Sequence, residues 1–294
     1  MGKSLYDNFS AAKNIFNSID NVLGFELSKK CFQAQAEQLK DTATQQLAIL
    51  AVSVAAFEVF SFKGIQPDYL SGLSLGEYSC LYAARVVSLE DLVILVRERA
   101  KAMQQAAKVS SSTMFAVIGA DMDFLKEKSR QEDFYIANIN SSSQVVVSLA
   151  KDIKDKVRSI LEIPGVRVVE LEVSGGFHSP FMIPAKDMLR EVIKKIQFND
   201  AKIPIVSNFT ARAHTREGEI KENLLEQLTS PVLWKECIEF MSEKGVDLFF
   251  EVGPAKVLRG LMRKINPKLK VVNIEKKEDL DNSLDEYSCI KEGK

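Results

Sequence analysis

A serine stands between two glycines in Gly72-Leu-Ser74-Leu-Gly76, after a short apolar run and before apolar residues at helical spacing. Gly-x-Ser-x-Gly at a strand-to-helix turn raises the serine hydroxyl above a sheet, where it can act as a nucleophile. The N–H of Leu75 and the start of the next helix would then face a developing oxyanion. A plain glycine-rich turn gives the same pentapeptide, so the motif alone leaves both interpretations open.

A nucleophilic serine needs a base, and the chain has only two histidines, His178 and His214. His178 follows two glycines in SGGFHSPFM, and glycines there permit close backbone approach. His214 lies in the polar stretch FTARAHTREG, which is typical of a solvated loop. We therefore expect His178 to be the partner of Ser74, while a structural role at a domain junction remains the alternative.

Two arginines lie on a helix that is predicted after the serine motif. Arg97 and Arg99 both lie in LVRERAKAM, on a helix predicted from residue 88 to about 107. Helical periodicity does not select between them, and lone arginines on helices are usually solvated.

The elements that must position these residues alternate between helices and strands. We expect helices at 5–21, 43–61, 77–84, 88–107 and 180–196, and strands at 69–71, 203–209, 247–253 and 270–274. Such alternation predicts a parallel sheet covered on both faces.

The residues between about 111 and 175 have a different order of strands and helices. Strands are predicted at 113–119, 134–140, 144–150 and 166–173, with helices at 121–131 and 151–161. The order β-α-β-β-α-β is typical of a ferredoxin-like unit. We therefore expect a small inserted subdomain at 111–175, and a large α/β subdomain formed by 1–110 and 176–294.

Composition narrows the classes of function. Of 294 residues, 46% are hydrophobic and 27% charged, with a net charge of −1, so there is no general electrostatic case for binding nucleic acid or an acidic membrane. The four cysteines lie far apart without metal-type spacing, so we expect reduced thiols, a cytoplasmic protein and no metal site. No apolar run is expected to be long enough to cross a bilayer, and no signal peptide is expected at the start.

Several separated stretches together resemble the malonyl-CoA:acyl carrier protein transacylases, acyltransferases that load fatty-acid and polyketide synthases. The matching stretches occur in the family's order and cover nearly the whole chain; they include GLSLGEYSCLYAARVVSLEDLVILVRERAKAMQ, GGFHSPFM, IPIVSNFTA, TSPVLWKECIEFM and EVGPAKVLRGL. The resemblance implies a large subdomain with an α/β-hydrolase-like core and a small ferredoxin-like subdomain, in agreement with the periodicity.

The resemblance also implies roles for individual residues. Ser74 would be the nucleophile, His178 its base, and Arg99 the residue that forms a bidentate pair with the malonyl carboxylate. The backbone carbonyl of Leu233, in SPVLW, would orient the imidazole of His178. Phe177, next to the base, would leave little room for an α-methyl branch and so favour malonyl over methylmalonyl groups.

The implied reaction moves malonyl from CoA to the phosphopantetheine thiol of acyl carrier protein through a malonyl-serine ester. Acyl carrier protein and malonyl-CoA are the expected partners, and no cofactor is implied. We expect a monomer.

The chain departs from the family in two places. Leu73 replaces a histidine that usually precedes the nucleophile, and Met1 falls after the glycine- and glutamine-rich loop that supplies a second oxyanion N–H in the family. Two alternatives therefore stay open: a hydrolase of acyl thioesters in a polyketide system, and a non-catalytic module that binds carrier protein.

Overall fold

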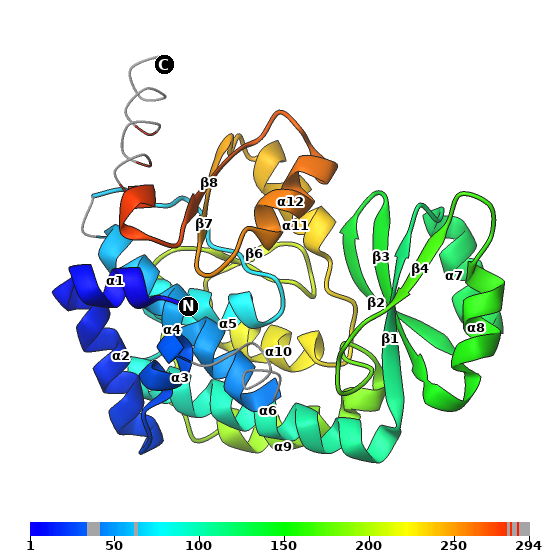
Figure 1. Cartoon of the computed structure of the whole chain (residues 1–294), viewed down its shortest axis with the longest axis horizontal. Coiled ribbons are helices and arrows are strands. Elements are labelled where there is room, and N and C mark those ends of the chain that lie inside the picture. The colour runs from blue at the N-terminus through cyan, green and yellow to red at the C-terminus, as the bar shows by residue number, and fades with distance from the viewer. Residues whose placement is uncertain (34–41, 62–63, 281–282, 284–286, 288–294) are drawn as a thin grey trace.

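The computed structural model describes residues 1–33, 42–61, 64–280, 283 and 287. Helices of the N-terminal part gather on one side of the molecule, and an antiparallel sheet with its own helices lies on the opposite side (Figure 1). The C-terminal strands and helices lie along the top of this view. The chain is thus an α/β protein with several separate sheets.

The first helical stretch is divided at Phe9. Helices α1 (Lys3–Asn8) and α2 (Ser10–Leu23) replace the single helix predicted at 5–21, because Phe9 adopts an extended backbone with φ −132° and ψ 120°. The apolar stripe predicted for this stretch remains buried, with Phe16 fully inaccessible. A short helix, α3 (Leu27–Gln33), follows.

Helix α4 (Thr42–Ser61) confirms the buried helix predicted at 43–61. By length and composition alone it is apolar enough to cross a membrane, so the expectation that no such run exists was wrong. Its apolar side chains lie in the main hydrophobic core, and 61% of its most apolar window is buried inside the protein. A core helix of a soluble protein meets the same criterion, so α4 is weak evidence for a membrane span.

Two helices follow the serine motif. Helix α5 (Leu75–Ala83) begins directly after Ser74, and α6 (Leu89–Ser110) begins after Ser88. The Ser88 hydroxyl accepts a hydrogen bond from the Asp91 N–H at 3.0 Å and so caps the start of α6. Helix α6 packs against α2, α4 and α9 and so lies within the helical layer.

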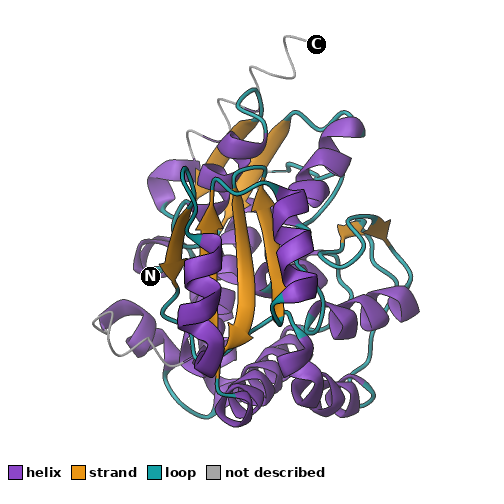
Figure 2. Cartoon of the chain, turned by 90° about the vertical axis from the view of Figure 1, so that its right-hand side faces the viewer, coloured by secondary structure: helices purple, strands orange, loops and turns teal. Residues whose placement is uncertain are grey.

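The middle of the chain forms a four-stranded antiparallel sheet in the order β2-β3-β1-β4. Its strands are β1 (Ser112–Ile118), β2 (Phe134–Ser141), β3 (Gln144–Ala150) and β4 (Arg167–Glu170). Helices α7 (Met122–Gln131) and α8 (Lys154–Leu161) lie across its outer face (Figure 2). The buried faces of these helices and strands form a hydrophobic cluster separate from the main core.

A turn of 3-10 helix, η3 (Pro180–Met182), leads from this sheet into α9 (Ile183–Ile193). Helix α10 (Glu217–Gln227) then packs beside α9, and α11 (Trp234–Glu243) and α12 (Val257–Ile265) pack against each other. A backbone bridge between Asn138 of β2 and Val232 ties the antiparallel sheet to the segment before α11.

The predicted parallel sheet is found only as separate pieces in the described residues. Leu70 forms a single parallel bridge with Ile205, and β7 (Leu248–Val252) pairs in parallel with β8 (Lys270–Ile274). The strand predicted at 203–209 is reduced to β5 (Ile205–Val206), which pairs antiparallel with β6 (Ala213–His214). The sequence thus predicted the parallel direction correctly but overestimated the length and continuity of the sheet.

Candidate active site

Ser74 occupies a strained turn between the Leu70 bridge and helix α5. Its φ of 52° and ψ of −98° lie in a region that residues with a side chain rarely adopt. Backbone strain of this kind persists where surrounding contacts enforce it, and it concentrates at functional sites. The turn therefore has the strained strand-to-helix geometry that the glycine-serine motif predicts.

The two glycines of the motif have different roles. A Cβ on Gly72 would lie 2.2 Å from the carbonyl carbon of Gly76, so no side chain fits at position 72. A Cβ on Gly76 would have nothing within 4 Å. The close approach of the two segments thus requires glycine at position 72, whereas position 76 has room for a side chain.

His178 reaches the serine from the loop between β4 and η3. Its Nε2 lies 2.8 Å from the Ser74 Oγ, and its Nδ1 lies 2.8 Å from the backbone carbonyl oxygen of Gln227. A carbonyl oxygen only accepts, so Nδ1 carries the proton and Nε2 accepts from the serine hydroxyl. The structure therefore brings together the two residues, 104 positions apart, that the sequence analysis paired.

The carbonyl that orients His178 is not the predicted one. Leu233 was expected to supply it, but the Leu233 carbonyl accepts from the Cys237 N–H at 2.9 Å, at the start of α11. Gln227, the last residue of α10, supplies the acceptor instead. The assignment to Leu233 was wrong because that carbonyl is used by the first turn of a helix.

The imidazole is held in its neutral form. His178 is 4% exposed, and burial lowers its pKa from 6.5 to about 4. The Gln227 carbonyl raises the pKa and the nearby charge of Arg99 lowers it further, both by less than burial does. A neutral Nε2 can take the serine proton at neutral pH, as a general base must.

Arg99 is the cation beside the pair. It is 1% exposed, and its Nη2 donates to the Ser74 Oγ at 3.0 Å. Its other acceptors are the amide oxygens of Gln46 at 2.5 Å and Gln227 at 3.2 Å. The guanidinium also lies over the Tyr78 ring, 4.7 Å from its centroid.

The structure decides between the two arginines that the sequence left open. Arg97 is half-buried and pairs with Glu98 at the helix surface. Arg99 has no ion pair among the described residues, and its Nε is buried without a hydrogen-bond partner. The acceptors that contact its guanidinium are neutral oxygens, so Arg99 is free to form an ion pair with an anionic ligand.

Two buried amides of the site were missed by the sequence analysis. The Asn208 Oδ1 accepts from the Ser74 N–H at 2.6 Å, and its Nδ2 donates to the Gly72 carbonyl at 2.9 Å. The Gln227 Nε2 donates to the Ser74 carbonyl at 3.1 Å. Both amides therefore fix the backbone of the strained turn.

A sequence signal existed for each of them. Asn208 follows the apolar run IPIVS, where polar residues at the carboxyl end of a predicted parallel strand mark a ligand site. Gln227 is fully buried among Leu224, Leu225 and Leu228, so it is a polar residue on an apolar helix face. Neither signal specifies a hydrogen-bond partner.

Leu75 and Phe177 flank the reacting pair along the chain. Leu75 is the first residue of α5, and first-turn N–H groups have no partner within their helix. Phe177 is half-buried against both the main core and the inner face of the antiparallel sheet, and its carbonyl accepts from the Ser148 hydroxyl at 2.7 Å. Both residues therefore adjoin the site, as the sequence predicts.

The other histidine does not join the site. His214 lies between the Thr210 hydroxyl at 2.8 Å and the Glu219 carboxylate at 3.1 Å, near the surface. Within the described ranges, no three His, Cys, Asp or Glu side chains gather in a group that could hold a metal ion.

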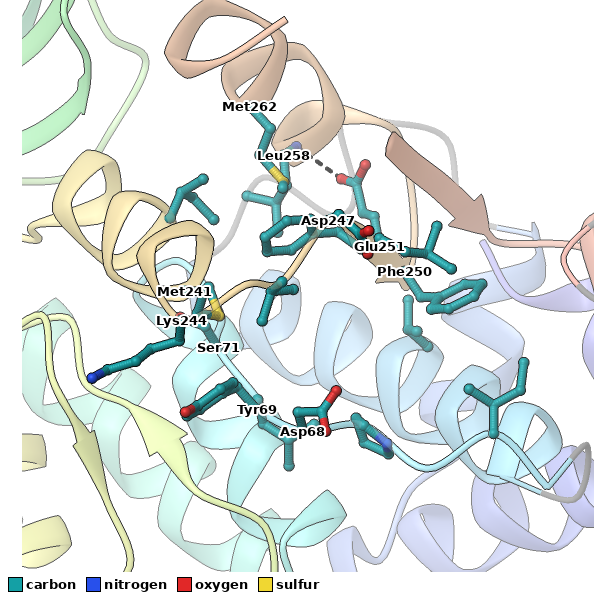
Figure 3. A pocket seen from close by; sticks show the side chains of 18 of the residues that line it. Asp68, Tyr69, Ser71, Met241, Lys244, Asp247, Phe250, Glu251, Leu258 and Met262 are labelled. Carbon is teal, nitrogen blue, oxygen red and sulfur yellow. Dashed lines mark hydrogen bonds between the residues drawn. The ribbon is translucent and has the colours of Figure 1, made fainter. Parts of the chain in front are cut away.

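A cavity of about 720 Å³ lies elsewhere in the molecule (Figure 3). Tyr69 and Ser71 line one side, and Phe250 and Glu251 of β7 line another. Ser74, His178 and Arg99 are not among the residues that line it. The cavity therefore adjoins the segment before Ser74 but not Ser74, His178 or Arg99.

The chain is similar to known proteins along nearly its whole length. The family model described as "Acyl transferase domain" matches residues 1–277. A protein of Bacillus subtilis named malonyl CoA-acyl carrier protein transacylase is 40% identical over 290 residues, covering 97% of this chain and 92% of its own.

Solved structures agree with the sequence match. An acyl-carrier-protein S-malonyltransferase from Bartonella henselae superposes with a TM-score of 0.93 at 34% identity, covering 97% of this chain and 93% of its own. A malonyl-transacylase in complex with its type II PKS acyl-carrier protein superposes with a TM-score of 0.92 at 32% identity, covering 97% and 94%. The chain belongs to the acyl transferase domain family, among the malonyl CoA-acyl carrier protein transacylases.

Proposed function

We propose that the chain transfers malonyl from malonyl-CoA to the phosphopantetheine thiol of acyl carrier protein, through a malonyl ester of Ser74. The observation that carries this proposal is the convergence of two groups on one oxygen. The Ser74 Oγ lies 2.8 Å from the His178 Nε2 and 3.0 Å from the Arg99 Nη2. A nucleophile, a neutral base and a buried cation within contact distance suit an acyl group that carries a carboxylate.

In the first half-reaction, the Ser74 hydroxyl attacks the thioester carbonyl of malonyl-CoA. His178 Nε2 takes the hydroxyl proton as the bond from Oγ to the carbonyl carbon forms. The tetrahedral intermediate then collapses, the bond between carbon and sulfur breaks, and the imidazolium returns the proton to the CoA thiolate. The products of this half are free CoA and malonyl-Ser74.

The second half-reaction reverses these steps with another thiol. His178 Nε2 takes the proton of the phosphopantetheine thiol as the sulfur attacks the ester, and returns it to the Ser74 Oγ as that atom leaves. Acyl carrier protein is the acceptor that the names of the relatives support, and one related malonyl-transacylase has been solved in complex with its acyl-carrier protein.

The Leu75 N–H is the proposed oxyanion donor. It lies next to the nucleophile at the start of α5, where the helix dipole also favours negative charge. Donors of this type act on the charge that develops in the transition state, so they lower the barrier rather than the KM.

Arg99 is the proposed receptor of the malonyl carboxylate. The amide oxygens of Gln46 and Gln227 hold the guanidinium in the site without neutralising it. An acetyl group lacks the carboxylate and would leave this cation buried and unpaired, so the same residue selects against it.

Phe177 is the residue proposed to limit the size of the acyl group at the malonyl carbon that lies between the two carbonyls. Phe177 precedes His178 in the chain and is half-buried against the main core, and we propose that its ring limits the room for a methyl branch. Exclusion of one methyl group by a pocket is worth about 1–3 kcal/mol.

We further propose a division into a large α/β-hydrolase-like subdomain, residues 1–110 and 176–294, and a ferredoxin-like subdomain, residues 111–175. The strand order β2-β3-β1-β4 with two helices on one face supports the latter. The cytoplasm is the proposed compartment, supported by the free thiols of Cys31, Cys80 and Cys237; Cys289 lies outside the described residues.

The test is transfer of labelled malonyl from malonyl-CoA to holo-acyl carrier protein, compared between the wild type and Ser74→Ala. We expect transfer by the wild type and none by the variant. Label released as free malonate at the same rate with and without carrier protein would identify a hydrolase. Carrier-protein binding without any transfer would identify a non-catalytic module. Either result would overturn the proposal.

A further inference from the structure

Glu77 is a buried carboxylate that the reaction as described does not use. It lies in the first turn of α5, and only 2% of the residue is exposed. Its Oε2 accepts from the Gln227 Nε2 at 2.7 Å and from the Asn208 N–H at 2.9 Å. Burying a carboxylate is costly unless its acceptor capacity is used, so these two bonds account for its place in the interior.

Both partners of Glu77 contact the reacting residues through other atoms. The carbonyl of Gln227 accepts the Nδ1 proton of His178 at 2.8 Å. The Oδ1 of Asn208 accepts the Ser74 N–H at 2.6 Å. The Glu77 Oε2 is thus linked to His178 through one residue, Gln227, and to Ser74 through one residue, Asn208.

The two partners come from segments that are distant in the chain. Asn208 follows β5, and Gln227 ends α10, whereas Glu77 is on the helix that begins at the nucleophile. Both residues donate to the Glu77 Oε2, and both also contact the backbone of Ser74, Asn208 at its N–H and Gln227 at its carbonyl. Without that acceptor, the Gln227 amide and the Asn208 N–H would each lose a buried partner, and the serine and histidine would lose a common anchor.

We propose that Glu77 is a positioning residue for acyl transfer: through Gln227 and Asn208 it holds the His178 imidazole and the Ser74 turn in contact. This inference rests on the proposed function for its reaction, although the geometry it explains belongs to the serine-histidine pair itself. Glu77 does not touch the reacting atoms, and its effect passes through the two amide residues.

The site needs an acceptor at this position more than it needs a negative charge. Burial raises the pKa of Glu77 to about 7, against the lowering effects of the Asn208 and Gln227 donors, a Ser207 contact and the charge of Arg99. The other titratable groups coupled to it, Tyr78, Cys80 and Cys237, are buried and have raised pKa values themselves. A glutamine at position 77 keeps an acceptor oxygen while removing the charge.

The test compares Glu77→Leu, which has no acceptor, with Glu77→Gln, which keeps one. The readouts are kcat and KM for malonyl transfer and the rate at which phenylmethanesulfonyl fluoride labels Ser74. For the leucine variant we expect kcat to fall on the order of 10²-fold with KM within about twofold, since small misplacements of reacting groups have effects of this size. The glutamine variant should retain activity within about threefold of the wild type.

Glu251 offers a matched control. It is 8% exposed, and its two oxygens accept from the N–H groups of Leu258 and Arg259 at the start of α12. Glu251→Leu also removes a buried acceptor of two donors. It should lower the melting temperature and leave the rate of Ser74 labelling unchanged.

Wild-type kcat in a folded Glu77→Leu variant, or an equal loss of labelling in the two leucine variants, would overturn the inference. If Glu77→Leu does not fold, Glu77→Asp replaces it in the test, because the shorter side chain moves the acceptor away from its two donors. A wild-type kcat in Glu77→Asp would overturn the inference. A lower kcat at unchanged KM would support it. If the wild type labels at Ser74 but does not transfer malonyl, the proposed function fails, while the labelling rates still test the role of Glu77.

Discussion

Replacement of Arg99 by glutamine tests how the site selects its acyl group. The guanidinium is 1% exposed and donates to three neutral oxygens, of Gln46, Ser74 and Gln227. It has no ion pair within the described part of the chain, and its Nε is unpartnered. A malonyl carboxylate that enters the site would form a direct ion pair with this guanidinium.

The size of the effect follows from the hydrogen bonds that the carboxylate would gain. A hydrogen bond to a charged group contributes about 1.5–3 kcal/mol, so a two-pronged pair contributes roughly 3–6 kcal/mol. This corresponds to a loss on the order of 10²–10⁴-fold in kcat/KM for malonyl-CoA. Acetyl-CoA forms neither bond, so its kcat/KM should stay constant or rise when the buried charge is removed.

The assay measures acylation of the protein by malonyl-CoA and by acetyl-CoA in parallel, with rapid quenching and intact mass detection. Arg99→Lys is the matched variant: it keeps the charge but cannot form the planar fork, so it should fall between the wild type and Arg99→Gln. A decrease of the same size for both acyl donors would refute the reasoning, because it would show that Arg99 supports the site without recognising the carboxylate.

Four further outcomes are expected. Burial lowers the pKa of His178 to about 4, so the base stays neutral above that pH and kcat/KM should fall only as the pH drops through about 4. Bound malonyl neutralises the neighbouring guanidinium and so raises the pKa of His178. The acid limb of the kcat profile should therefore lie at higher pH than that of kcat/KM. Phe177→Ala should raise kcat/KM for methylmalonyl-CoA relative to malonyl-CoA by about 10–200-fold in competition assays; an unchanged ratio would remove the size argument. Gly72→Ala should unfold the protein at lower temperature, because its Cβ would meet the Gly76 carbonyl carbon at 2.2 Å, whereas Gly76→Ala should maintain or raise the melting temperature; equal shifts would contradict the packing described. Asn208→Leu leaves the nucleophile's N–H unpaired and should cost about 1–3 kcal/mol in urea unfolding, with no loss indicating that the bond contributes nothing.

The sequence predicted the contact between Ser74 and His178 because the residue types left few choices. One glycine-serine motif and two histidines made the pairing of Ser74 with His178 a short search, and the structure places their side chains 2.8 Å apart. The antiparallel sheet was also predictable, since the alternation of its strands and helices is local. Its strands lie within a few residues of the predicted ones.

The remaining contacts depend on which segments meet in space. Gln227 ends one helix and Leu233 precedes the next, and only the fold decides which of the two carbonyls faces the imidazole. Arg99 lies on the buried stripe of its helix with Leu92 and Leu95, but periodicity could not exclude the exposed neighbour.

The sequence pattern also could not predict how long the parallel strands are. Apolar runs at 203–209 and 69–71 predicted strands, but only Ile205–Val206 and the bridge at Leu70 form. An apolar run indicates that a segment is buried, but the loops around Ser74 are buried as well, so the run does not distinguish a strand from a loop. Continuity of a sheet depends on partners that the pattern of a single segment does not specify.

The most direct test of the central claim is peptide mapping after a brief mixing of the protein with malonyl-CoA. We predict a malonyl adduct on the peptide that contains Ser74, formed at a rate that Glu251→Leu leaves unchanged and His178→Ala reduces strongly, and discharged when holo-acyl carrier protein is added. An adduct on any other residue, or equal acylation rates with and without the imidazole, would contradict the account.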